Sequence, residues 1–155
     1  MPALSRWMIR SALVNFWIGF TMGALLLARK GDSDLLPPEI WQWIPAHVNL
    51  LLIGWMVQLA MGVAYWILPR LPNTRTKRGR FAFAVAAAGL LNSGVWLHVI
   101  AVMAAPWYQN SSTTLTLQTV GLMLQFLGAL SFALHIYPRV RATIVESQVL
   151  IESRT

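Results

Sequence analysis

Residues 45–70 read PAHVNLLLIGWMVQLAMGVAYWILPR, an apolar run that begins two residues before a histidine and ends at Pro69-Arg70. A run of this length is sufficient to cross a bilayer as a helix, which takes roughly 20 residues. At about 100° per residue, several later side chains lie within about 40° of His47: Leu51, Gly54, Gln58, Met61 and Tyr65. The stretch therefore predicts a membrane helix with one polar stripe, headed by a histidine.

The composition indicates a membrane protein rather than a water-soluble domain. Of the 155 residues, 57% are hydrophobic and 11% are charged, and the mean hydropathy is +0.58. The absence of cysteine excludes disulfides, thiolate zinc sites, iron–sulfur clusters and covalent c-type heme. Any metal or heme ligand must then be His, Met, Tyr or a carboxylate.

Four apolar runs are long enough to span a bilayer, at about 8–28, 46–69, 81–105 and 116–137. We expect an all-α, integral membrane four-helix bundle that forms one domain over residues 1–155, with a tail at 138–155. The first run is too long for a signal peptide, so we expect a retained helix. The prolines at 37, 38 and 45 disfavour helix before the second span begins.

Basic residues set the expected topology. Ten of the 12 Lys and Arg residues fall in the N-terminal segment, between the second and third runs, or after the fourth run. Only Arg29 and Lys30 lie on the other side. The positive-inside rule then places both termini in the cytoplasm. We expect the membrane to be a prokaryotic inner membrane. The net charge of +7 is explained in this way, without nucleic acid as a partner.

Small and polar side chains recur every four residues in the first run, at Ser11, Asn15, Gly19 and Gly23. Such a stripe lets a second membrane helix approach closely. For Gln58 and Tyr65, hydrogen bonding between helices is favoured over a polar path or a contact with a cofactor.

The three histidines differ in expected depth. His47 lies about two residues and His98 about seven residues inside the same membrane boundary, a difference of roughly 8 Å before tilt. Each is either an axial heme ligand or a histidine bonded elsewhere: His47 at the headgroups, His98 to a neighbouring helix. His135 lies near the inner boundary, too far away to share their site, and is interpreted as a residue near the phosphate layer.

The second run resembles the second transmembrane helix of subunit I in the heme-copper oxidase superfamily, closest to C-type oxidases and nitric oxide reductases. The resemblance rests on Pro45-x-His47-x-Asn49, Gly54-Trp55, Gly62, Tyr65 and Pro69-Arg70. It implies that His47 ligates a low-spin heme b, with Gly54 leaving room for the macrocycle. Arg29 and Lys30 lie where the heme propionates would point, although they also suit the end of the first span.

The sequence departs from that family in size and in its later histidines. A subunit I has about twelve spans, and this chain has four and lacks any His-x-His or His-His pair. A copper–heme centre is therefore incomplete within one chain. The family's helices resemble three groups of four, so a homo-oligomer, a trimer for example, would mimic them. Two copies of His47 would then lie at equal depth on either side of one heme.

Three functions remain open from the sequence. The first is a b-type hemoprotein that passes electrons from quinol or an external carrier, with His47 and either His98 or a second His47 as ligands. The second is a structural or assembly subunit of a larger respiratory complex, without a cofactor. The third is a heme-based gas sensor with an open iron position. No nucleophile–base pair or phosphate loop indicates catalysis.

Overall fold

The computed structural model describes residues 1–155 except 33, 69–79, 109–110 and 153–155, and gives only the backbone helix for 141–152. Pro69 and Arg70 of the second run therefore lie outside the described residues. So do four more of the basic residues that were counted for the topology: Arg75, Lys77, Arg78 and Arg154. The described chain is all helical, in line with the predicted all-α class.

The elements follow the expected four runs. Helix α1 spans Ala3–Gly31. The second run is built from four consecutive helical segments: a 3-10 helix η1 (Pro38–Trp43), α2 (Ile44–Asn49), a π-helix η2 (Leu50–Val57) and α3 (Gln58–Ile67). Helices α4 (Phe81–Ala104) and α5 (Ser112–Glu152) complete the chain.

Four helices are long and apolar enough to cross a membrane: Ala3–Gly31, Pro38–Ile67, Phe81–Ala104 and Ser112–Val140. The prediction of four spans is confirmed by length and composition, and the chain is an integral membrane protein on this evidence. The helical structure begins earlier than expected in the second span, because Pro38 and Pro45 occupy first-turn positions of η1 and α2. Proline is tolerated there, since those N–H groups have no helical partner in any case.

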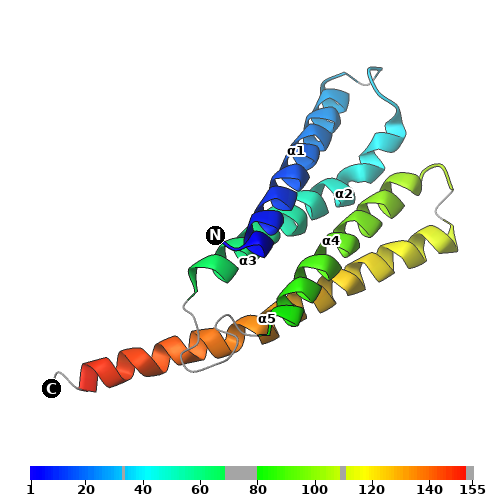
Figure 1. Cartoon of the computed structure of the whole chain (residues 1–155). Coiled ribbons are helices and arrows are strands. Elements are labelled where there is room, and N and C mark those ends of the chain that lie inside the picture. Colours follow the sequence, from blue (N-terminus) through cyan, green and yellow to red (C-terminus); the bar gives the residue numbers. More distant parts are fainter. Residues whose placement is uncertain (33, 69–79, 109–110, 153–155) are drawn as a thin grey trace.

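The helices form two antiparallel hairpins, and α5 runs on beyond the others toward the C-terminus (Figure 1). Two apolar clusters join α1, the second span and α4. One contains Met22, Ala46, Leu50, Val95, Val99 and Val102. The other contains Met8, Met61, Ala87, Ala88 and Leu91. Three helices thus share the core, and α5 packs mainly along α4.

Glycines set the close approach of α4 and α5. A Cβ atom at Gly94 would lie 2.6 Å from the Gly121 carbonyl oxygen, and one at Gly128 would lie 2.8 Å from the Leu91 nitrogen. Backbone meets backbone at both places, as is common where small residues line a membrane-helix interface.

One backbone carbonyl of the π-helix accepts a hydrogen bond from a neighbouring helix. The Gln58 N–H bonds to the carbonyls of Ile53 and Trp55 and passes over the one between them, at Gly54. Asn15 Nδ2 of α1 donates to that Gly54 oxygen at 2.8 Å. The carbonyl that the Gln58 N–H passes over is thus bonded by a side chain of α1.

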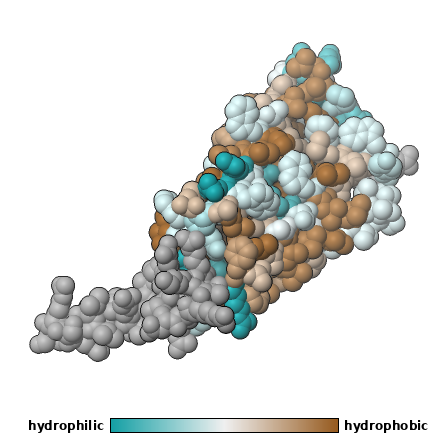
Figure 2. All heavy atoms as spheres, viewed as in Figure 1, coloured by the Kyte–Doolittle hydropathy of each residue, from teal (hydrophilic) through white to brown (hydrophobic). Residues whose placement is uncertain are grey.

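The outer surface is largely apolar, as Figure 2 shows for one face. Large hydrophobic side chains are exposed on every helix, including Trp17 (74%) and Phe126 (64%). Water solvates such a surface poorly, whereas lipid tails solvate it well.

Candidate functional site

His47 is held by α1 through one ring nitrogen. Its Nδ1 lies 2.8 Å from the Gly19 carbonyl oxygen. A carbonyl oxygen only accepts, so Nδ1 carries the proton and donates. A Cβ at Gly23 would lie 2.7 Å from His47 Cε1, so the imidazole rests directly against the backbone of α1. The stripe that was predicted for helix packing thus includes Gly19 and Gly23, which seat this ring.

In the neutral form of the ring, this arrangement leaves Nε2, the other nitrogen of His47, without a proton. In the described part of the chain, Nε2 has no hydrogen-bond partner, and the side chain is half-buried. A neutral imidazole with Nδ1–H on a backbone carbonyl presents Nε2 as a lone-pair donor, which is the usual state of a metal-binding histidine.

His98 faces a different helix. It is only 7% exposed, and its Nδ1 lies 3.4 Å from the Gln118 carbonyl oxygen on α5. A Cβ at Gly121 would meet His98 Cβ at 2.9 Å, so His98 is packed between α4 and α5. His47 contacts α1 and His98 contacts α5, so their contacts do not bring the two rings to one site.

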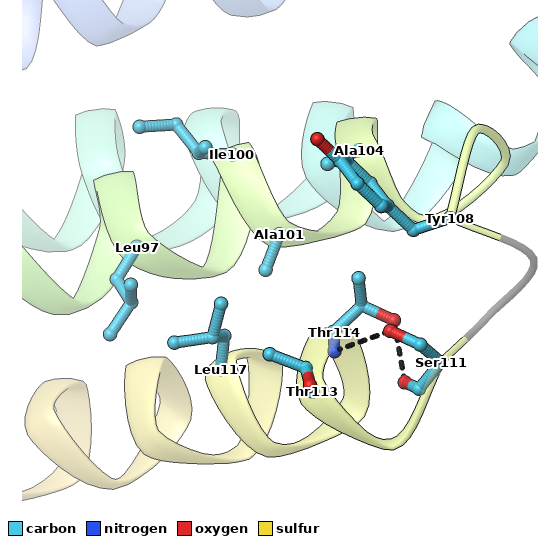
Figure 3. A pocket seen from close by; sticks show the side chains of 9 residues that line it. All are labelled: Leu97, Ile100, Ala101, Ala104, Tyr108, Ser111, Thr113, Thr114 and Leu117. Carbon is cyan, nitrogen blue, oxygen red and sulfur yellow. Dashed lines mark hydrogen bonds between the residues drawn. The ribbon is translucent and has the colours of Figure 1, made fainter.

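A pocket of about 380 Å³ lies between α4 and α5, near the loop that joins them (Figure 3). Leu97, Ile100 and Leu117 line it on one side and Tyr108 on the other. The polar groups of Ser111 and Thr114 are already bonded to each other. No histidine lines this pocket, so it offers carbon surface rather than an iron ligand.

The other residues predicted around His47 differ in what they contact. The space beside Gly54 is filled by the Asn15 amide, 2.9 Å from where a Cβ would lie, so Gly54 admits α1 rather than a macrocycle. Arg29 is half-buried, and its Nε and Nη1 atoms are buried without a partner in the described chain. Lys30 is exposed. Arg29 therefore has two buried donors without a partner in the described chain.

Gln58 and Tyr65 serve contacts between helices. Gln58 Nε2 donates to the Met8 carbonyl oxygen at 3.3 Å, which confirms the expectation of an interhelical bond. The Tyr65 ring stacks on His135, with centroids 5.4 Å apart. Both side chains are buried, as the stripe predicts, together with Gly54 and Met61.

His135 packs inside the protein, against Tyr65 of α3 and the start of α4. It is buried, and its Nδ1 donates to the Arg80 carbonyl oxygen at 3.2 Å. Four residues later, Arg139 is 1% exposed and donates to the carbonyls of Tyr65 and Leu68, at the end of α3. Sequence reasoning counted Arg139 as a topology signal and missed its role at the C-terminal end of a helix, where a cation is favourable.

Among the described residues, no three His, Cys, Asp or Glu side chains gather in a group that would hold a metal ion. These residues therefore do not form a site in which several side chains hold a single metal ion. A heme iron, by contrast, needs only axial ligands from the protein. No family model, no curated protein and no solved structure matches this chain. The site's chemistry therefore has to be argued from its own residues.

Proposed function

We propose that the chain is a b-type heme-binding membrane protein that transfers electrons, with His47 as an axial ligand through Nε2, related to subunit I of the heme-copper oxidases. The observation that carries the proposal is the hydrogen bond from His47 Nδ1 to the Gly19 carbonyl, which in the neutral ring selects the tautomer with Nε2 as the lone-pair donor. A histidine that only anchored the chain at the headgroups would not need to pack against the backbone of Gly23.

A bound heme would supply one-electron chemistry at its iron. The residues of the chain would hold and orient it. The Gly19 carbonyl makes the imidazole a better electron donor by accepting the Nδ1 proton's hydrogen bond. Arg29, with two buried donors unused in the described chain, suits a propionate carboxylate.

The second axial ligand comes, in this proposal, from His47 of a second copy of the chain. Two observations favour this over His98. His98 is directed at α5, and His47 is half-buried and so accessible at the surface of one chain. Copies of His47 related by rotational symmetry lie at the same depth, which a planar macrocycle between two ligands requires. A homo-oligomer, a trimer in the simplest analogy with the family, is the expected state.

The same proposal includes the finer topology. Both termini lie in the cytoplasm, the membrane is a prokaryotic inner membrane, and His47 lies near its outer face. Electrons would come from quinol or from an external carrier.

The test is a reduced-minus-oxidised absorption spectrum of the protein, purified after expression with ample heme. Sharp α and β bands are expected for a low-spin center with two histidine ligands. A colorless protein under these conditions would contradict the proposal.

One alternative has an observation in its favour. His47, His98 and His135 each bond to a backbone carbonyl, which satisfies one nitrogen of each ring without any cofactor. A cofactor-free structural or assembly subunit of a respiratory complex would look the same in this respect. It predicts the colorless protein and co-purification with larger partner subunits.

A further inference from the structure

A second pocket, of about 230 Å³, lies between α1 and α4. The residues that line it recur at helical spacing, so each helix contributes one face. From α1 these are Trp7, Arg10, Ser11, Val14 and Asn15, and from α4 they are Asn92 and Trp96. Pockets for drug-sized molecules measure roughly 300–1,000 Å³, so this one suits a small polar group.

The pocket lies at one end of the membrane-spanning part of α1. Arg10 and Arg29 are separated by about 28 Å along this helix, close to the roughly 30 Å of a bilayer's hydrocarbon core. Because both guanidinium groups favour the head groups, Arg10 lies at the boundary opposite Arg29. Trp7, 46% exposed, lies one turn further out, and Val14, 52% exposed, lies one turn further in, among the lipid tails.

Arg10 gives the pocket a positive charge that no carboxylate balances. Its side chain is exposed, and in the described part of the chain it makes no hydrogen bond or ion pair. The five acidic residues of the sequence fall within 32–39 and 146–152, so neither helix of the pocket carries one. The guanidinium fork therefore has its donors available for an anion.

The other polar groups of the pocket also suit an anion. Ser11 has a hydroxyl to donate, and the indole N–H of Trp7 and of Trp96 only donates. Asn92 Nδ2 donates to the Ala88 carbonyl of its own helix at 3.3 Å and carries a second hydrogen. A choline head group would bring a cation next to Arg10, so the pocket favours a head group with net negative charge.

We propose that this pocket binds the phosphate of an anionic phospholipid such as phosphatidylglycerol. The phosphate pairs with the Arg10 guanidinium, Ser11 and Asn92 donate to its other oxygens, and an acyl chain lies along Val14 in the hydrocarbon. Basic pockets between membrane helices are suited to anionic head groups in this way. The proposal concerns lipid binding alone and does not depend on a heme at His47.

The experiment titrates the whole chain in detergent, at physiological ionic strength, with phosphatidylglycerol and with phosphatidylcholine of the same acyl chains. Native mass spectrometry measures the bound lipid. Phosphatidylglycerol should bind at least about fivefold more tightly, the factor that one arginine near an anionic lipid provides. Equal affinities for the two lipids would overturn the proposal.

Two variants with the same change of charge locate the site on α1. Arg10→Gln should weaken phosphatidylglycerol binding about 10-fold or more, because charge-assisted hydrogen bonds are lost. Arg6→Gln is the matched control, since Arg6 is exposed one turn earlier and does not line the pocket. It should bind within about twofold of the parent, because salt screens exposed charges that make no direct contact. Equal affinities for the two variants would contradict the proposal.

A change on the opposite wall tests the pocket itself. Asn92→Leu should weaken phosphatidylglycerol binding about threefold to tenfold, as the loss of a hydrogen bond implies. The fold does not depend on this amide, which bonds within its own helix. Ser93→Leu, at an exposed neighbouring position, is the control and should bind as the parent does. If Asn92→Leu also binds as the parent does, the lipid lies outside the pocket and the proposal fails.

Free phosphate is the rival source of the same chemistry. An excess of inorganic phosphate should leave the bound phosphatidylglycerol in place, because the acyl chains add apolar contacts that the free ion lacks. Displacement of the lipid by phosphate would make the pocket a site for the soluble ion and would overturn the proposal. The absorption spectrum tests the heme separately, so failure of one proposal leaves the other standing.

Discussion

At the scale of single residues, the position of His47 depends on the glycines of the opposing helix. The ring touches the α1 backbone at Gly23, and its Nδ1 bonds to the Gly19 carbonyl one turn away. Any side chain at residue 23 must displace the imidazole, since the Cβ atom would lie 2.7 Å from Cε1.

We predict that Gly23→Ala impairs heme binding without unfolding the protein. Moving the ring breaks the Nδ1 hydrogen bond, and loss of such outer contacts typically costs 10- to 100-fold in metal affinity. The measurement is heme titration followed by absorbance. Gly31→Ala is the control, because nothing lies within 4 Å of a Cβ there, and it should titrate as the parent does. Equal affinities for the two variants would count against His47 as a ligand.

Residue-level prediction from the sequence worked where burial follows the helical period. Gly54, Gln58, Met61 and Tyr65 are buried as their spacing predicts. It did not predict the hydrogen-bond partners of His135 and Arg139, which are the backbone carbonyls of Arg80, Tyr65 and Leu68. Contacts to backbone leave no pattern in the sequence.

At the scale of elements, the contact between α4 and α5 is as close as two helices allow. At Gly94 the nearest atoms are the Gly121 carbonyl oxygen and the Gln125 nitrogen. These atoms are backbone and cannot move aside as a side-chain end would. A methyl group there must push the helices apart.

Gly94→Ala should therefore lower the free energy of unfolding by about 1–3 kcal/mol, the usual cost of overpacking. Gly89→Ala, on the same helix but with open space around the Cβ, should be neutral or stabilise by about 0.5–1 kcal/mol, since alanine favours helix. Thermal unfolding in detergent, followed by circular dichroism, compares the two. A Gly94→Ala protein as stable as its Gly89→Ala counterpart would refute the close contact.

The existence of the four helices could be predicted from apolar run length, but the π-helix at Leu50–Val57 could not. A π turn closes over five residues rather than four, so it alters which side chains face a neighbour. What accommodates it is a tertiary contact, from Asn15 to the Gly54 carbonyl. The sequence therefore predicted open space beside Gly54, whereas in the structure the Asn15 amide occupies that space.

At the scale of the whole molecule, the expected topology rests on the basic residues, many of which lie outside the described chain. The chain has no cysteine, so a single introduced one reports its side of the membrane. Leu35 and Phe81 are both exposed and lie at opposite ends of the spans.

We predict that Leu35→Cys reacts with a membrane-impermeant maleimide in intact cells, and that Phe81→Cys reacts only after the cells are opened. The physical reason is the positive-inside rule, which keeps the basic segment near residue 80 in the cytoplasm. The reverse labelling pattern would invert the topology and place His47 near the inner face.

The most direct test of the central claim, that His47 ligates heme, is the reduced-minus-oxidised spectrum of His47→Ala, His98→Ala and His135→Ala beside the parent protein. The account predicts that His47→Ala loses the sharp α and β bands. It also predicts that His98→Ala and His135→Ala keep them, because those rings face other helices. Bands that persist in His47→Ala would contradict the account.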